Sequence, residues 1–320
     1  MAITPTEHKM VLVNFNMFPP FCFEKHQPRT LAAGILCSKS FALRANAKLA
    51  QCDTLVRMSI PYYHIDSFAS ELFAGNPAGV CLVPAFPVDA VMQKIAAENR
   101  HSETAFVVRR ADGDFDLRWF TPIVEDDLCG HATLASAYAL SLRGHDRWPV
   151  RFHTVSGLLT VDRDHERLEM DFPSRPAAPC QVPRGLLSAL GLETAEVMRE
   201  PRDYLVVASH AGIVKNLKPD IPALAKIDMG IGGVIVTAPA EQDADYVCRF
   251  LAPSEGIDED QATGSIQCTL VPYWAARTGK QTFRVRQLSS RGGRMWCKLA
   301  GGRVKIAGEA KLYLEGTIHI

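Results

Sequence analysis

The feature that most constrains the fold of this chain is an internal repeat. Residues 118–140 contain a strand-like run, a proline turn, a cluster of acids, a small-glycine-polar element and then an apolar stretch. Residues 249–276 repeat these features in the same order, and the two copies differ by three residues in the length of one loop. Such a duplication predicts two halves of similar structure, each built around a buried apolar helix.

Each copy opens its apolar helix with a similar element, Cys129-Gly130-His131 in the first and Thr263-Gly264-Ser265 in the second. Backbone N–H groups at the start of a helix lack a helical partner and carry a partial positive charge. A glycine there leaves room for an anion to approach. Either element alone can be a simple helix cap. The duplication, with acids beside both copies, favours two helix N-termini that face one cleft.

From residue 60 onward, short β-type runs alternate with helical stretches, which predicts an α/β (α+β) chain. The strand-like runs are rich in valine and isoleucine, whereas the helical stretches are longer and are bounded by proline or glycine. Clear examples of strands are 79–83, 104–108 and 233–236, and clear examples of helices are 88–98 and 132–142.

The first 57 residues differ from the rest of the chain. They contain seven Lys or Arg residues against three acids, and they show no sustained helical or strand period. An acid-poor basic leader is typical of a transit peptide, but it also fits an upstream extension from a start codon placed too early. We predict that residues 1–57 pack poorly and carry no catalytic residue, and that a chain starting at Met58 folds as the full chain does.

Composition narrows the choice of partner. The formal net charge is +0, so there is no global field to attract nucleic acid or an anionic membrane. No stretch approaches the ~20 apolar residues that span a bilayer. Nine widely spaced cysteines without a CxxC pair are typical of reduced thiols in a cytoplasmic protein. No nucleotide-binding loop, GxSxG elbow or metal-binding histidine motif occurs, so we expect no cofactor and no metal.

Several motifs occur in an order that resembles one known family, the PhzF-like (phenazine biosynthesis-like) isomerases. They are spread collinearly over about residues 60–310, so the resemblance rests on the set and not on any single match. The motifs are AGNPAGV at Ala74–Val80, SETAFV at Ser102–Val107, FTP at Phe120–Pro122, CGHATLA at Cys129–Ala135 and EDQATGS at Glu259–Ser265.

The resemblance implies the diaminopimelate epimerase-like fold. In that fold two pseudo-repeated domains each wrap a barrel-like sheet around a central helix, and the active site lies in the cleft between them. We therefore place the halves at 58–172 and 173–320. The prolines Pro173, Pro176 and Pro179 fit a segment that crosses from one half to the other.

The resemblance also implies roles for individual residues. The catalytic glutamate of the family corresponds to Glu103, which would take a proton from one carbon of the substrate and return it to another. From local sequence alone, an exposed glutamate at a strand end is the favoured interpretation of Glu103, and the resemblance reverses this. His131 and Asp260 correspond to the family's active-site histidine and aspartate. Substrate-binding residues would be Asn76, Gly130, Gly264 and Ser265.

The function that we expect is a cofactor-independent isomerase, similar to trans-2,3-dihydro-3-hydroxyanthranilate isomerase, that moves a proton within a small carboxylate-bearing metabolite. A homodimer is common in the family. One alternative is an amino-acid-type racemase or epimerase that uses Cys129. Epimerases of this fold use two cysteine bases, but the second position here is Thr263, so an inert thiol fits better. Another alternative is a non-enzymatic protein that binds a small metabolite.

Overall fold

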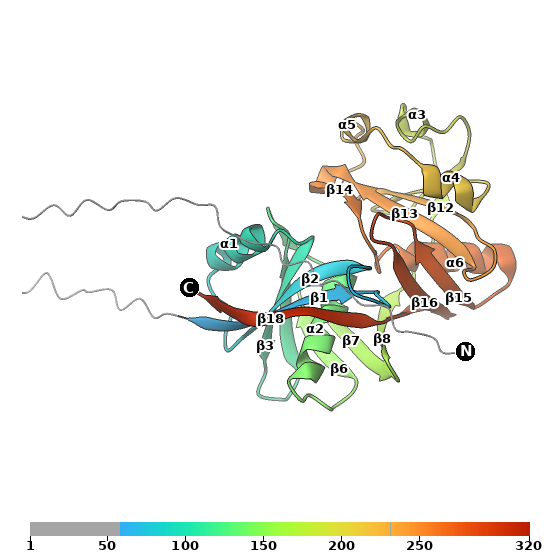
Figure 1. The fold of residues 1–320 in the computed structure, drawn as a ribbon. Coiled ribbons are helices and arrows are strands. Elements are labelled where there is room, and N and C mark those ends of the chain that lie inside the picture. The colour runs from blue at the N-terminus through green and yellow to red at the C-terminus, as the bar shows by residue number, and fades with distance from the viewer. Residues whose placement is uncertain (1–57, 231) are drawn as a thin grey trace, which may run out of the picture. The chain divides into compact units, whose positions relative to one another are not determined.

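The computed structural model describes residues 58–230 and 232–320, and all of these belong to one folded unit (Figure 1). The predictions for residues 1–57 lie outside the described residues. We refer to residues 58–172 as the first half and to residues 173–320 as the second half. Within the described ranges, no helix is both long enough and apolar enough to cross a membrane.

The first half is a sheet of mixed direction with a helix on each face. Pairing is antiparallel except between β2 and β3 and between β4 and β6, where it is parallel. The elements, in chain order, are β1 (Ser59–Ser67), β2 (Asn76–Val83), α1 (Asp89–Asn99), β3 (Glu103–Arg109), β4 (Phe115–Phe120), β5 (Glu125–Asp126), α2 (Gly130–Leu142), β6 (Val150–Thr154), β7 (Gly157–Asp164) and β8 (Arg167–Pro173).

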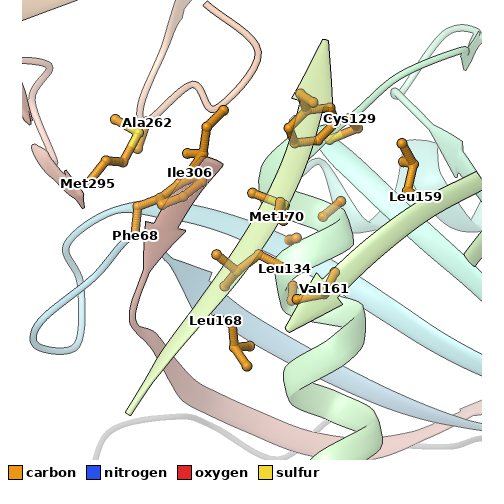
Figure 2. Packing of buried hydrophobic residues seen from close by; sticks show 14 of the residues in the cluster. Phe68, Cys129, Leu134, Leu159, Val161, Leu168, Met170, Ala262, Met295 and Ile306 are labelled. Atoms are coloured by element: carbon orange, nitrogen blue, oxygen red, sulfur yellow. The ribbon is translucent and has the colours of Figure 1, made fainter. Parts of the chain in front are cut away.

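Helix α2 occupies the inside of this sheet. Ten of its thirteen residues are buried, because the helix carries small and apolar side chains on every side. It packs against β1, β2, β3 and β8. Figure 2 shows Leu134 of α2 beside Met170 and Val161, which come from the surrounding strands. Helix α1 covers the outer face, where Met92 and Ile95 pack with Phe106.

The second half repeats this plan around α6. Its elements, in chain order, are β9 (Ala178–Pro179), α3 (Leu186–Ala189), β10 (Glu196–Arg199), β11 (Tyr204–Val207), α4 (Ala211–Asn216), α5 (Ile221–Leu224), β12 (Val234–Pro239), β13 (Tyr246–Ala252), η1 (Pro253–Glu255), β14 (Ile257–Asp260), α6 (Gln267–Thr278), β15 (Thr282–Gln287), β16 (Gly293–Ala300), β17 (Arg303–Gly308) and β18 (Ala310–His319).

Strand β13 is buried along its whole length because both of its faces are covered. Successive side chains of a strand point to opposite faces. Tyr246 and Cys248 accordingly join the core around α6, whereas Val247 and Leu251 join a separate core that includes residues of α4 and α5. The absence of a period-2 pattern in this strand thus reflects burial on both sides.

The C-terminal strands connect the two halves. Strand β17 pairs with β16 of the second half and with β8 of the first, and β18 then pairs with β1 along nearly its whole length. The segment 303–319 therefore closes the first sheet between its edge strands β8 and β1, which gives it a barrel-like form (Figure 1).

The predicted diaminopimelate epimerase-like fold, with two pseudo-repeated domains that each wrap a sheet around a central helix, is confirmed. The strands predicted at 79–83, 104–108 and 233–236 correspond to β2, β3 and β12, and the helices at 88–98 and 132–142 correspond to α1 and α2. The domain limits 58–172 and 173–320 stay a prediction. The structure adds that β18, from the end of the second range, pairs with the first strand of the other.

Candidate active site

The two central helices begin next to each other. Helix α2 starts at Gly130, and α6 is preceded by a turn in which the N–H of Gln267 donates to the carbonyl of Gly264 at 3.0 Å. A methyl group added to Gly130 would lie 3.5 Å from Cα of Gly264, and one added to Gly264 would lie 3.7 Å from Cα of Gly130. Because both positions are glycine, the two helix starts approach closely and still leave space for a ligand.

A cavity of about 580 Å³, including its open mouth, lies at this point. Six of the seven predicted site residues, all of which the structure describes, line this cavity, and the seventh, Asn76, does not. Both halves contribute, so the cavity lies between them. The lining residues are Glu103, Asp126, Leu128, Cys129, Gly130, His131, Arg175, Arg202, Asp203, Phe250, Ala252, Ile257, Asp260, Thr263, Gly264 and Ser265.

Glu103 is the first residue of β3 and lies opposite Ala78 in the parallel pairing with β2. Its side chain is buried, which excludes the exposed strand-end glutamate that local sequence also allowed. Its Oε2 lies 3.1 Å from Nε2 of His131. The structure thus places a carboxylate and an imidazole in contact in the wall of the cavity.

His131 lies in the first turn of α2 and is also buried. Burial lowers the pKa of His131, and the nearby negative charge of Asp260 opposes this shift only in part. The ring is therefore neutral at ordinary pH. The amide nitrogen of Asn76, which can only donate, lies 3.2 Å from Nδ1. Nε2, the other ring nitrogen, faces Glu103.

Asn76 lies behind the cavity and holds its two halves in register. The side chain is fully buried. Its amide nitrogen lies 2.7 Å from Oδ1 of Asp260, 3.1 Å from the carbonyl oxygen of Ala262 and 3.2 Å from Nδ1 of His131, so its two N–H groups are shared among three acceptors. These contacts join a histidine of the first half to an aspartate of the second. The role in substrate binding stays a prediction for Asn76, whose contacts are those of a residue that positions others.

Asp260 is the last residue of β14 and is held by several donors. Besides Asn76, the Thr263 hydroxyl donates to Oδ2 at 2.6 Å and the Gln261 N–H donates to Oδ1 at 3.1 Å. Gln287 secures the same loop, since its Nε2 donates to the carbonyl of Asp260 and its Oε1 accepts the N–H of Thr263. The carboxylate therefore has a fixed orientation at the cavity.

The family model described as phenazine biosynthesis-like protein (PhzC-PhzF) matches residues 65–316. The chain belongs to the PhzC-PhzF family. An uncharacterized isomerase of Pseudomonas aeruginosa is 47% identical over 264 residues, which is 82% of this chain and 100% of the relative.

Solved structures agree with this assignment. A PhzF-family protein of Enterococcus faecalis is 40% identical with a TM-score of 0.78, over 82% of this chain and 100% of that one. A hydroxyproline epimerase from Agrobacterium vitis, crystallised with trans-4-hydroxy-L-proline, is only 13% identical, with a TM-score of 0.54 over 82% of this chain and 93% of that one. This second likeness shows that the PhzC-PhzF family shares its fold with epimerases.

Cys129 lies beside the histidine but is poorly suited to act as a base. Its Sγ is 3.5 Å from Nδ1 of His131. Burial, and then the negative charge of Glu103, raise the pKa of the thiol well above its usual value. Cys129, His131 and Glu103 lie together, with one ligand atom of each within 4.8 Å of the other two, so the three side chains are also close enough to hold a metal ion.

Four charged residues of this PhzC-PhzF cavity lie outside the set of predicted site residues. Arg175 donates to the carbonyl of Ser265 at 3.1 Å. Arg202, of the second half, forms an ion pair at 3.2 Å with Asp127 of the first half. Burial raises the pKa of Asp126 to about 6 and is the main cause that raises the pKa of Asp203 to about 7. Asp126 belongs to the acidic cluster of the repeat, but the turn that contains Asp203 matches no motif.

Proposed function

We propose that this PhzC-PhzF protein is a cofactor-independent isomerase that moves a proton within a small carboxylate-bearing metabolite, with Glu103 as the proton shuttle. The observation that carries the proposal is the buried Glu103 carboxylate, 3.1 Å from a neutral imidazole, in a cavity that two helix N-termini share. The relatives that are named isomerases support the same reaction type.

The helix starts would bind the carboxylate of the substrate. The N-terminal turns of α2 and α6 present backbone N–H groups and the positive ends of two helix dipoles, and the Ser265 hydroxyl adds a donor. Gly130 and Gly264 leave the backbone uncovered there. A carboxylate bound at this place would direct the rest of a small molecule toward Glu103, Asp260 and the rest of the wall.

Glu103 would then act as base and acid in turn. Its carboxylate takes a proton from one carbon, and the electron pair of the broken C–H bond moves into the adjacent unsaturated system. The Glu103 carboxylic acid returns the proton to another carbon of that system on the same face, since one base reaches one face. His131, whose Nε2 lies 3.1 Å from Oε2 of Glu103, would hold the carboxylate in place. Asp260 would hold an amino or hydroxyl group of the substrate.

The racemase alternative receives less support. Inversion at one carbon requires a base on each face, and the counterpart of Cys129 in the repeat is Thr263. The Thr263 hydroxyl already donates to Asp260, and the Cys129 thiol has a raised pKa. A non-enzymatic metabolite-binding role would not require the buried carboxylate–imidazole contact. A cytoplasmic location and a homodimer are further parts of the proposal.

The test is turnover of trans-2,3-dihydro-3-hydroxyanthranilate in D₂O, followed by NMR, for wild type, Glu103→Gln and Cys129→Ser. Glutamine keeps the size of the side chain and removes the base, so we expect its rate to fall by at least about 100-fold. Cys129→Ser serves as the matched control and should stay active. Equal rates for wild type and Glu103→Gln would refute the shuttle, and loss of activity only in Cys129→Ser would favour the racemase.

If wild type leaves this compound unchanged, the substrate is wrong. A series of small cyclic carboxylic acids would then be incubated in D₂O and examined for deuterium at carbon. Exchange that depends on Glu103 would retain the isomerase with another substrate. No exchange with any of these acids would refute the proposed reaction type.

A further inference from the structure

A pair of buried carboxyl groups lies in a tight turn that the proposed reaction does not use. The turn joins β10 to β11 and contains Glu200, Arg202 and Asp203. The side chains of Glu200 and Asp203 are only 3% and 4% exposed. Their backbones are tied together, because the N–H of Glu200 donates to the carbonyl of Asp203 at 3.1 Å and the N–H of Asp203 donates to Oε1 of Glu200 at 2.8 Å.

Asp203 lines the same cavity as Glu103 but comes from the other half of the protein. The N–H of Gly233 donates to its Oδ1 at 2.8 Å. Gly232 adopts a φ of +124°, and a methyl group there would lie 2.7 Å from the same oxygen. The glycine therefore allows the backbone before β12 to come up to the carboxyl group, which fixes the Asp203 side chain in the cavity wall.

The two carboxyl groups of the pair influence each other's ionisation. Two adjacent carboxyl groups in a buried site do not both ionise readily, because each negative charge disfavours the other. Burial, followed by the charge of Glu200 and a side-chain hydrogen bond to it, raises the pKa of Asp203. Arg202 of the same turn opposes this shift in part while it pairs with Asp127.

Other charged groups face this region from neighbouring elements. Asp126, which precedes α2, lines the cavity from the first half. Arg175, on the crossing segment, lines it from the second half. The charge of Arg175 lowers the pKa of the Cys268 thiol in α6, and the charge of Glu200 raises it. Asp203 thus lines one cavity with the starts of both central helices and with two arginines, Arg175 and Arg202.

We propose that Asp203, paired with Glu200, is a proton-dependent determinant of substrate affinity in this cavity. With a proton on Asp203, the wall that it forms is neutral and accepts a carboxylate-bearing ligand. After loss of the proton, the wall is negative and repels that ligand. The inference rests on the proposed function in one respect, namely that the ligand is a small carboxylate.

This arrangement predicts a specific pH dependence of binding. If only the form with protonated Asp203 binds, affinity falls as the proton is lost, and the dissociation constant rises about tenfold between pH 6 and pH 8 for a group that titrates near 7. This pH dependence should therefore appear in KM, because Asp203 does not touch the transferred proton in the proposed mechanism. The kcat measured at saturating substrate should not follow this titration.

The experiment measures the dissociation constant of benzoate, a small cyclic carboxylate that stays ionised from pH 5.5 to pH 8.5, by isothermal titration calorimetry. Asp203→Asn mimics the protonated acid and keeps the acceptor for Gly233, so its affinity should be independent of pH. Glu200→Gln removes the neighbouring charge, so the loss of affinity should move to lower pH. Asp126→Asn tests the other cavity acid with a raised pKa, and Asp258→Asn, at an exposed acid that does not line the cavity, is the matched control and should retain the wild-type rise near pH 7.

Each outcome decides the question. A wild-type pH dependence that persists in Asp203→Asn would overturn the inference, as would an Asp126→Asn variant that alone becomes independent of pH. No benzoate binding at any pH up to millimolar concentration would refute the anion site and the inference with it. Benzoate binding that loses its pH dependence in Asp203→Asn, in a protein that exchanges no substrate proton, would retain the inference and refute the isomerase.

Discussion

The Asp203→Asn substitution should stabilise the folded protein progressively more as the pH rises. In the folded state the pKa of Asp203 is raised from 3.8 to about 7, with burial as the main cause. Folded protein therefore binds more protons than unfolded protein between these values. Its free energy of unfolding falls as the pH rises through this window and levels off above pH 7. Asparagine carries no charge in either state and removes this loss.

The magnitude follows from the two pKa values. A shift of about three units is worth about 4 kcal/mol in full, at about 1.4 kcal/mol per unit. Between pH 5 and pH 8, the part of the window that is convenient to measure, the difference in unfolding free energy between variant and wild type should grow by roughly 2 to 3 kcal/mol. Because the side chain is almost fully buried, solvent screening reduces this value little.

Urea unfolding at pH 5, 6, 7 and 8, followed by circular dichroism, measures this difference. Asp126 also has a raised pKa and makes the stability of both proteins fall with pH, so the comparison uses the difference between variant and wild type at each pH. Asp258→Asn, at an exposed acid, is the control and should show no growing difference. A difference between Asp203→Asn and wild type that does not change with pH would refute the linkage.

Two further predictions concern the helix starts. Gly130→Ala should fold normally, because the added methyl would make only an ordinary contact at 3.5 Å with Gly264. The methyl should nevertheless raise KM, because it narrows the proposed anion site. An unchanged KM with unchanged thermal stability would contradict that site. Cys129 should react with iodoacetamide far more slowly at pH 7.5 than a free thiol does, because the Cys129 thiol is buried and its pKa is raised. Rapid labelling of the folded wild type, but not of Cys129→Ser, would contradict this.

The central parts of the fold could be predicted because their sequence signals are local. Small-glycine-polar elements before two apolar helices predicted where Gly130 and Gly264 would lie, and the glycines do bring the helix starts together. Burial on every side of α2 followed from its composition. By contrast, the pairing of β18 with β1 joins residues about 250 positions apart, and no local pattern reports such a partner.

Residues of the cavity likewise divide into those with a local sequence signal and those without one. Glu103, His131 and Asp260 lie in motifs, so resemblance to a family indicated them. Asp203 lies in a turn between two short strands, and its meaning comes from Glu200 beside it and from the cavity in front of it. A carboxylate in a polar turn is ordinarily exposed, so only the three-dimensional structure distinguishes this one.

Asn76 gives the strongest reason to regard the two halves as one functional unit. Its single amide group donates to His131 on one central helix and to Asp260 beside the other. The first of these contacts orients the imidazole ring whose Nε2 faces Glu103, and the second orients the carboxylate that faces the substrate. The orientation of groups in both halves thus depends on one buried side chain. Since the chain also crosses between the halves at 173–179 and again at 303–319, neither half alone can assemble this site.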